Sequence, residues 1–337
     1  MSKRDPWREL PDTRPAAAPA EAGGHVHLDE VDKALIAQLE LDARTPFAHL
    51  GATVGLSADA VRERVRRLQR DRVVEFVAAV SPAVLGIERI ALVGLRTRGP
   101  LDVIGGELSL VPEVDFVAAV AGRYSFLVEL MCRDSDDLLR VLTQVTSIAG
   151  VDVAQVYSYL RVWKWNAGGR RTPLKAGSSV DGRSPGLDDI DRLLTAELQK
   201  DARASFSAMA SNLSLSYSLV RRRVQALLRS EDVSLVTVVN RITTGTATMA
   251  SIGLRTEGEL RPVARSIVEL PEVEIAILTT GPFDMLLEVA VASERDLGDL
   301  VQRIRSVPGV TGTEAHEYLR ILKLPTSWSP AISDTGT

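Results

Sequence analysis

The spacing of apolar residues changes partway along this chain, and the whole pattern then occurs a second time. Over residues 28–75 apolar residues recur every three or four positions, which is the period of an amphipathic helix. Over residues 88–165 they form runs of strand length that alternate with further helical stretches. The same succession returns over residues 187–234 and 246–324. The pattern therefore predicts a helical domain followed by a mixed helix-and-strand domain, present in two copies.

A fixed offset of 159 residues aligns the two copies without a gap over most of their length. A register held over this distance indicates a tandem duplication. We call two residues that lie 159 positions apart equivalent. The matching words include Leu-Asp at 28 and 187, Asp-Ala-Arg at 42 and 201, Gly-Leu-Arg-Thr at 94 and 253, Pro-Glu-Val at 112 and 271, and Tyr-Leu-Arg at 159 and 318.

The helical half of each copy carries the start and stop signals of three short helices. In the first copy Asp29 is expected to cap the first helix, and Thr45 is expected to cap a second helix that begins with Pro46. Gly55 then supplies the positive φ of a tight turn, and Ser57 caps a third helix. Three short helices with a tight turn between the last two predict a winged helix-turn-helix.

The third helix of each copy divides into an apolar face and a basic face. At about 100° per residue, Val61, Val65 and Leu68 point inward. One interpretation is a solvated face that only keeps the helix soluble, but the capped turn behind two helices, present twice, favours DNA binding. The DNA-binding candidates are Ser57, Asp59, Arg62, Arg66 and Arg70 in the first copy, and Ser216, Tyr217, Ser218, Arg221, Arg222, Gln225 and Arg229 in the second.

The two third helices differ at their front ends, where residues would reach base edges. The first copy reads Ser-Ala-Asp-Ala over residues 57–60, and the second reads Ser-Tyr-Ser-Leu over residues 216–219. Arg62 or Arg221 can clamp guanine, and Asp59 can accept a hydrogen bond from a cytosine amine. The remaining arginines would bind phosphate, which gives position rather than sequence. The sequence therefore predicts a DNA site with two non-identical half-sites.

The second half of each copy predicts strands and helices in the order βαββαβ. In the first copy the strands are expected at Arg89–Thr97, Val114–Gly122, Tyr124–Cys132 and Val151–Trp165, with a helix after the first and third strands. This is the ferredoxin-like plan, so the fold class is α+β. Two such sheets in one chain can pair as the subunits of a homodimer do.

Composition and charge narrow the functional classes. The net charge of −4 and the pI near 5.7 argue against a protein that coats nucleic acid non-specifically. The single cysteine, Cys132, cannot form an internal disulfide, which suits the cytoplasm. No apolar run is long enough to span a membrane. Residues 1–27 and 325–337 are expected to be tails, the first of them disordered, and residues 166–186 are expected to be a flexible linker.

These motifs together resemble the Lrp/AsnC (feast/famine) transcription regulators over nearly the whole chain, twice. The resemblance is carried by Leu-Asp and Asp-Ala-Arg in the first half, Gly-Leu-Ser before the third helix, and Pro-Glu-Val, Gly-x-Tyr and Tyr-Leu in the second half. It implies a homodimer that reads roughly palindromic double-stranded DNA, often assembles further, and binds a small effector, commonly an amino acid, near a hairpin loop. This chain would be a fused pseudo-dimer that needs no cofactor.

The hairpin loop of each copy departs from the family pattern Gly-x-Tyr-Asp. The first copy keeps the tyrosine and loses the carboxylate, whereas the second keeps the carboxylate and loses the hydroxyl. An amino-acid ammonium favours a carboxylate partner, although the same carboxylate can instead cap a turn. The effector-binding candidates implied by the resemblance are Gly122, Tyr124, Ser125, Gly281, Phe283 and Asp284.

Two rival interpretations remain open at this level. Siroheme decarboxylases resemble the same family, but of the four histidines only His316 lies in a βαββαβ unit, and no metal-ligand spacing or nucleophile–base pair accompanies it. We therefore expect no enzyme activity and no metal. The second rival is an effector-binding partner protein that has lost DNA binding, because Ser214 replaces Gly55 at the turn of the second copy.

Overall fold

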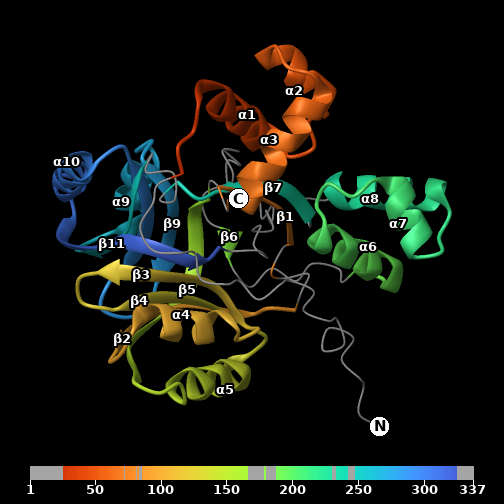
Figure 1. The fold of residues 1–337 in the computed structure, drawn as a ribbon. Helices are drawn as coiled ribbons and strands as arrows, with labels where there is room; N and C mark the ends of the chain where they lie inside the picture. Colours follow the sequence, from red (N-terminus) through yellow and green to blue (C-terminus); the bar gives the residue numbers. More distant parts are fainter. Residues whose placement is uncertain are drawn as a thin grey trace, which may run out of the picture.

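The computed structural model describes residues 26–71, 73–80, 82, 86–165, 178–179, 187–229, 233–241 and 247–324. Both predicted tails lie outside these ranges except for residues 26 and 27, and so does the predicted linker except for residues 178 and 179. None of the described helices is long and apolar enough to cross a membrane. Figure 1 shows the two groups of three helices standing apart from a body of strands that both copies build.

Each copy begins with three short helices that pack around a small apolar core. In the first copy Leu35, Leu39, Leu50, Val61 and Val65 are buried together, and the burial of Val61 and Val65 is the one that the helical spacing predicts. Asp29 caps the first helix in a reciprocal capping box with Asp32. The helices are α1 (Glu30–Leu41), α2 (Phe47–Val54) and α3 (Ala58–Arg70) in the first copy, and α6 (Asp189–Lys200), α7 (Phe206–Asn212) and α8 (Tyr217–Arg229) in the second.

The predicted start of the second helix is wrong by one residue. Helix α2 begins at Phe47 and Pro46 is its N-cap, with no side-chain cap bond. Thr45 does not cap the helix, because its hydroxyl donates to the carbonyl of Asp42 at 2.9 Å, back in the preceding loop. The second copy has Ser205 at the equivalent of Pro46, and this serine does cap its helix by accepting from the N–H of Ala208.

The second half of each copy has the predicted ferredoxin-like order of elements. In the first copy these are β2 (Arg89–Thr97), α4 (Leu101–Ser109), β3 (Val114–Ala121), β4 (Phe126–Cys132), α5 (Ser135–Thr146) and β5 (Val151–Trp165). In the second copy they are β8 (Thr248–Thr256), α9 (Leu260–Val268), β9 (Val273–Thr279), β10 (Met285–Val291), α10 (Glu294–Arg305) and β11 (Val310–Lys323).

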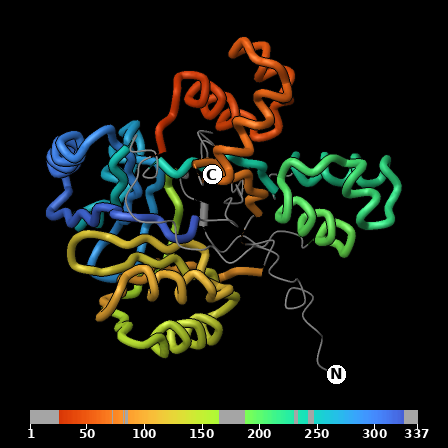
Figure 2. Tube along the Cα trace, viewed as in Figure 1, coloured from red at the N-terminus to blue at the C-terminus, as the bar shows by residue number. Residues whose placement is uncertain are grey.

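The two sheets pair with each other and close into a ring. The strand order is β2-β4-β3-β11-β8-β10-β9-β5, and β5 returns to β2. Two antiparallel pairings, β11 with β3 and β5 with β9, join the copies, and Figure 2 shows the yellow and blue segments side by side there. The short strand β6 (Ser178–Ser179) also pairs with β5. The pairing expected of a homodimer therefore occurs within one chain.

A two-stranded ribbon, which the sequence did not predict, joins the copies a third time. Strand β1 (Val74–Val80) follows the first helix-turn-helix, and β7 (Val233–Val239) follows the second. The two strands are antiparallel, and Val77 lies opposite its own equivalent, Val236. A register centred on equivalent residues places a pseudo-two-fold axis through the ribbon.

Each group of helices rests on the ribbon strand of the other copy. On one side Leu194 and Leu198 of α6 pack against Ala78 and Val80 of β1. On the other side Thr237 of β7 donates its hydroxyl to the carbonyl of Leu39 at the end of α1, at 2.6 Å. This crossed packing fixes both helix-turn-helix units to the pseudo-dimer body.

Candidate nucleic-acid interface

The tight turn before the third helix is formed in both copies. Gly55 has φ of 74°, and its equivalent Ser214 has φ of 54°. Among the residues that the structure describes, Ser214 is the one non-glycine residue with a positive φ. In both copies the next residue donates its N–H back to the second helix, from Leu56 to Gly51 and from Leu215 to Ala210, at 2.9 Å. The substitution of glycine by serine therefore leaves the second turn intact, at the expense of a strained backbone.

The third helices start at capped residues, as the sequence predicts. The hydroxyl of Ser57 accepts from the N–H of Ala60 at 3.2 Å, and that of Ser216 accepts from the N–H of Leu219 at 3.3 Å. The inward positions Val61, Val65 and Leu68 are fully buried, and so are their equivalents in α8. Both helices therefore present the expected residues outward.

Arginines on the rear flank of α3 and α8 lock the helices to the first helix of each unit. Arg64 donates to Asp29 at 2.6 Å and to Asp32 at 2.9 Å, and its equivalent Arg223 lies 2.8 Å from Asp188 and 3.3 Å from Asp191. The N–H of Asp32 and then the guanidinium of Arg64 lower the pKa of Asp29 to about 2. These arginines hold the helix in place and are not part of the reading face.

The outward residues of α3 are all exposed, and the outward arginines lie close to acids on the same helix. Arg62 forms an ion pair with Asp59. Arg66 and Arg70 each lie 3.9 Å from Glu63. The positive charge of this face is therefore partly compensated before any ligand arrives.

The outward residues of α8 are exposed as well, except for Gln225, which is half-buried. Within the described part of the chain no ion pair engages Arg221, Arg222 or Arg229. The difference follows from the sequence, because the positions of Asp59 and Glu63 are occupied by Ser218 and Arg222 in the second copy. Among the residues that the structure describes, no acid therefore pairs with the basic face of α8.

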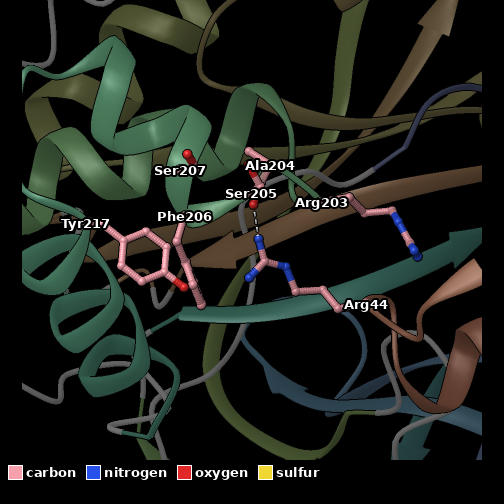
Figure 3. A pocket seen from close by; sticks show the side chains of 7 residues that line it. All are labelled: Arg44, Arg203, Ala204, Ser205, Phe206, Ser207 and Tyr217. Atoms are coloured by element: carbon pink, nitrogen blue, oxygen red, sulfur yellow. Dashed lines mark hydrogen bonds between the residues drawn. The ribbon is translucent and has the colours of Figure 1, made fainter.

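An arginine from each copy, missed as a functional residue in the sequence, joins the two helix-turn-helix units. Arg44 donates to the carbonyls of Ala202, at 3.2 Å, and Ala204. Its equivalent Arg203 donates to the carbonyls of Ala43 and Thr45, the latter at 2.9 Å. Figure 3 shows Arg44 pointing at the second copy. We call these two residues the arginine clasp; the repeated Asp-Ala-Arg word was the sequence signal for it.

The hairpin loops contribute one buried aromatic ring each to the core between the copies. Tyr124 stacks on His316 with ring centroids 4.9 Å apart, and Phe283 stacks on Tyr157 at 5.8 Å. Tyr157 and His316 are equivalent residues on β5 and β11. The hydroxyls of Tyr124 and Tyr157 are 2.8 Å apart. Each loop therefore lies against the last strand of the other copy.

The polar members of the hairpin candidates make the same backbone contact in both copies. The hydroxyl of Ser125 accepts from the N–H of Thr97 at 3.1 Å, and Oδ2 of Asp284 accepts from the N–H of Thr256 at 2.7 Å. Asp284 also accepts from the hydroxyl of Thr256 at 3.1 Å. One oxygen of Asp284 therefore serves the turn, while Gly122 and Gly281 are exposed at the tips of the loops.

A glutamic acid from each copy lies beside a tyrosine of the closed sheet, and Glu129 is buried while its equivalent Glu288 is half-buried. Tyr159 donates its hydroxyl to Glu129 at 2.7 Å, and Tyr318 donates to Glu288 at the equivalent position. Burial raises the pKa of Glu129 and that of Glu288 to about 8. Both carboxyls are therefore protonated at neutral pH, and the interior of the two copies is chemically alike.

The histidines of the described residues do not form a metal or catalytic cluster. No group of three or more metal-ligating side chains occurs in the part of the chain that the structure describes. The ring of His316 is packed under Tyr124, with Nε2 3.2 Å from a carboxylate oxygen of Glu314, and burial lowers its pKa. His49 is exposed on α2.

Two protein families match the chain, each of them twice. The AsnC-type helix-turn-helix domain matches residues 28–69 and 187–228. The Lrp/AsnC ligand binding domain matches residues 90–166 and 249–328. Together these matches cover well over half of the sequence.

Curated relatives have the length of one copy. The chain is 30% identical over 139 residues to the HTH-type transcriptional regulator FL11 of Pyrococcus furiosus, which is 41% of this chain and 92% of that protein. It is 36% identical over 132 residues to the HTH-type transcriptional regulator Rv2324 of Mycobacterium tuberculosis, which is 38% of this chain and 89% of that protein. These relatives are named as regulators of transcription.

A solved structure is similar to the chain across both copies. The siroheme decarboxylase NirDL superposes with a TM-score of 0.54 at 14% identity, covering 89% of this chain and 94% of that chain. At this level of identity the similarity extends to the fold alone.

Proposed function

This chain belongs to the Lrp/AsnC family, and from that premise we propose that it is a sequence-specific regulator of transcription that binds double-stranded DNA in the cytoplasm. The family makes it a DNA-binding regulator with a ligand-binding domain; the specificity and the roles of single residues are our proposal. Its two helix-turn-helix units would act on one DNA site together, because the ribbon and the closed sheet hold them in one body.

The observation that carries the proposal is the pair of capped third helices with exposed outward arginines. In the proposed complex, Arg62 and Arg221 contact guanine, and Asp59 accepts a hydrogen bond from a cytosine amine. Ser57, Arg66 and Arg70 in α3, and Ser216, Tyr217, Ser218, Arg222, Gln225 and Arg229 in α8, contact further base edges or phosphates. Because the position of Asp59 is occupied by Ser218 in the second copy, each helix would select its own half-site.

The half-site proposal is tested by selecting duplexes from a random library with the purified chain. We expect an asymmetric consensus with two different halves. Duplexes in which one half replaces the other are then compared at fixed salt, because affinities of this kind depend steeply on salt. Each wrong base pair is expected to weaken binding about fivefold to a hundredfold. Equal affinity for the symmetric and the asymmetric duplexes would contradict the proposal.

We also propose that a small effector such as an amino acid binds between the copies at the hairpin loops. The candidate residues remain Gly122, Tyr124, Ser125, Gly281, Phe283 and Asp284. The proposal is supported by the position of each loop against the last strand of the other copy, since an effector there would touch both halves. Oδ2 of Asp284 bonds to Thr256, and Oδ1 is the atom that would accept from an ammonium group.

The effector proposal is tested by thermal unfolding with a panel of amino acids. A ligand at a hundred times its Kd stabilises the folded chain by about 2.7 kcal/mol. Asp284→Asn is expected to abolish the shift for the amino acid that binds, whereas Asp152→Asn, the same change at an exposed residue outside the hairpin loops, is expected to leave it. If no amino acid shifts the unfolding temperature of the wild type, the effector is of another class.

The similarity in fold to a siroheme decarboxylase raises the alternative that this chain is such an enzyme, and one titration distinguishes the two functions. We propose that this chain is not a decarboxylase, because its one buried histidine in the closed sheet is occupied by stacking on Tyr124 and by Glu314. Adding a tetrapyrrole to the purified chain should then produce no change in the position of its absorbance bands. A stoichiometric spectral shift would overturn this assignment.

A further inference from the structure

The arginine clasp brings two positive charges together at the junction of the helix-turn-helix units. Arg44 and Arg203 are equivalent, and each reaches across to the carbonyl oxygens of the other copy. Arg44 lies over the ring of Phe206 at 5.3 Å, and Arg203 lies over the ring of Phe47 at 4.4 Å. The contacts are reciprocal, so the clasp follows the pseudo-two-fold symmetry that relates the two copies.

No acid forms an ion pair with the clasp in the described part of the chain, although the charges of Asp42 and Asp201 act on both guanidinium groups. Within the described residues neither guanidinium has a carboxylate within ion-pair distance, and all of their hydrogen bonds go to neutral carbonyls. Burial lowers the pKa of both arginines, and the charge of Arg44 lowers that of Arg203 further, while each remains protonated. Each guanidinium has five N–H donors and uses two in the clasp, so donors remain on both.

Two aromatic rings connect the clasp to the front of both third helices. The ring of Phe47 has Arg203 on it at 4.4 Å and Arg62 of α3 at 5.7 Å. The ring of Phe206 has Arg44 on it at 5.3 Å and meets Tyr217 of α8 edge-on at 6.4 Å. The clasp is therefore linked through one aromatic ring in each copy to a residue near the start of each third helix.

A pocket of about 440 Å³ opens at the clasp. Arg44 and Arg203 line it together with Ala204, Ser205, Phe206, Ser207 and Tyr217 (Figure 3). Its polar side chains are two guanidinium groups and three hydroxyls. Tyr217 and Ser207 are exposed, so the pocket is open to solvent. The lining includes these donor groups and no carboxylate, which suits an anion with several acceptor oxygens.

We propose that Arg44 and Arg203 jointly bind one phosphate of the DNA backbone between the two half-sites. This inference rests on the proposed function and adds a contact at the centre of the site, away from the third helices. The bound phosphate, with one negative charge, would offset one of the two positive charges of the clasp. It would also fix the distance between the half-sites, because the same two residues hold the helix-turn-helix units together.

The double variant Arg44→Gln/Arg203→Gln tests the contact through the salt dependence of binding. Each phosphate that a protein neutralises contributes about 0.9 to the slope of log affinity against log salt. We expect the variant to lower the magnitude of that slope by about 0.9 on a selected duplex, with affinity at least about tenfold weaker at physiological salt. Arg98→Gln/Arg265→Gln makes the same change of charge on exposed residues of the strand body and should leave the slope unchanged.

Neutral methylphosphonate linkages locate the phosphate independently. Substituted one at a time along the duplex, they should weaken wild-type binding at the centre of the site and have no effect there on the Gln variant. Tyr217→Phe removes a hydroxyl without touching the clasp and should reduce the central effect in part. Arg44→Lys/Arg203→Lys keeps the charge and should keep the slope, even where it loosens the junction.

Each result decides a separate question. An unchanged slope in the Gln variant, with relaxed preference for half-site spacing, would make the clasp purely structural and overturn the inference. Stabilisation by inorganic phosphate without DNA, lost in the Gln variant and combined with no central methylphosphonate effect, would assign the pocket to a free anion and overturn it as well. Failure of the wild type to bind any duplex would instead overturn the proposed function.

Discussion

Helices α3 and α8 occupy equivalent places, and their proposed DNA-binding faces differ in how the charge of the arginines is balanced. In α3 the arginines are paired with Asp59 and Glu63, whereas α8 has Ser218 and Arg222 at these positions and no acid at all. Their buried residues match and their backbone turns match. The duplicated scaffold therefore left the outward positions free to diverge while the inward ones stayed alike.

The difference assigns different work to the two helices. An exposed ion pair contributes only about 0.2–1 kcal/mol, so DNA can break the pairs of α3 at modest cost. New contacts replace these ion pairs only where bases or phosphates fit the released side chains, so α3 would favour particular DNA sequences. The arginines of α8 have no ion pair to break among the described residues, which favours affinity and strong salt dependence.

Removing the arginines of α8 should have the largest effect on DNA affinity. Arg221→Ala/Arg222→Ala is expected to weaken binding about a hundredfold at physiological salt, because two uncompensated contacts are lost. Arg62→Ala/Arg66→Ala is expected to weaken it about tenfold, since Asp59 and Glu63 already offset part of that charge. Gel shift over a salt series measures both. A larger loss from the α3 pair would reverse the assignment, and no loss from the α8 pair would make the second unit inert.

The matching interiors should give matching responses to pH. The pKa of Glu129 and that of Glu288 are about 8 in the folded chain, above the ordinary 4.5, so the folded state keeps protons that the unfolded state releases. The free energy of unfolding should therefore fall as pH rises from about 4.5 to 8, by up to about 5 kcal/mol for each residue. Glu129→Gln and Glu288→Gln should each flatten urea-unfolding stability against pH by a similar amount. Unequal responses would show that the two interiors differ.

The turns before the third helices should respond in opposite directions to exchange of their residues. Gly55→Ser is expected to cost about 1 kcal/mol, because a side chain at positive φ is strained. Ser214→Gly is expected to gain about 0.5 kcal/mol, since relief of strain is partly offset by the entropy of glycine. Hydrogen exchange of the amides in each helix-turn-helix reports the two units separately. Gly55→Ala is the control, and equal behaviour of Gly55→Ser and Ser214→Gly would contradict the argument.

Releasing the arginines of α3 from their acid should have the smallest effect. Glu63→Gln removes the partner of Arg66 and Arg70 and is expected to strengthen DNA binding about threefold at low salt, with less effect at high salt. Arg222→Gln is the matched change in α8 and should weaken binding. A decrease in affinity with Glu63→Gln would mean that the acid orients the arginines and does not merely compensate them.

The sequence predicted what is encoded locally or by repetition. Capping at Asp29 and Ser57, the turn at Gly55, and the six elements of each second half follow from residue types and their spacing. The offset of 159 residues turned weak signals into a strong one, because each motif occurred twice. The resemblance to the Lrp/AsnC family was carried by the same repeated sequence motifs. At Pro46 the prediction failed because the proline itself occupies the cap, so the helix begins one residue later.

The contacts between the copies could not be derived in the same way. The ribbon strands β1 and β7 pair only with each other, so their register depends on residues far apart in sequence. Arg44 and Arg203 carried a repeated motif, but their acceptors are backbone carbonyls, which leave no trace in a list of side chains. The stacking of Tyr124 on His316 likewise depends on closure of the sheet. Such contacts are decided by three-dimensional packing and not by local preference.

The ribbon that pairs Val77 with Val236 also has a consequence for how much protein a cell must make. Two separate subunits joined by the same strands would come apart on dilution, following the law of mass action. Here both strands belong to one polypeptide, so the partner is always present at the concentration set by its tether. The two copies can therefore stay paired even at a few molecules per cell, and their pairing does not depend on the concentration of the chain.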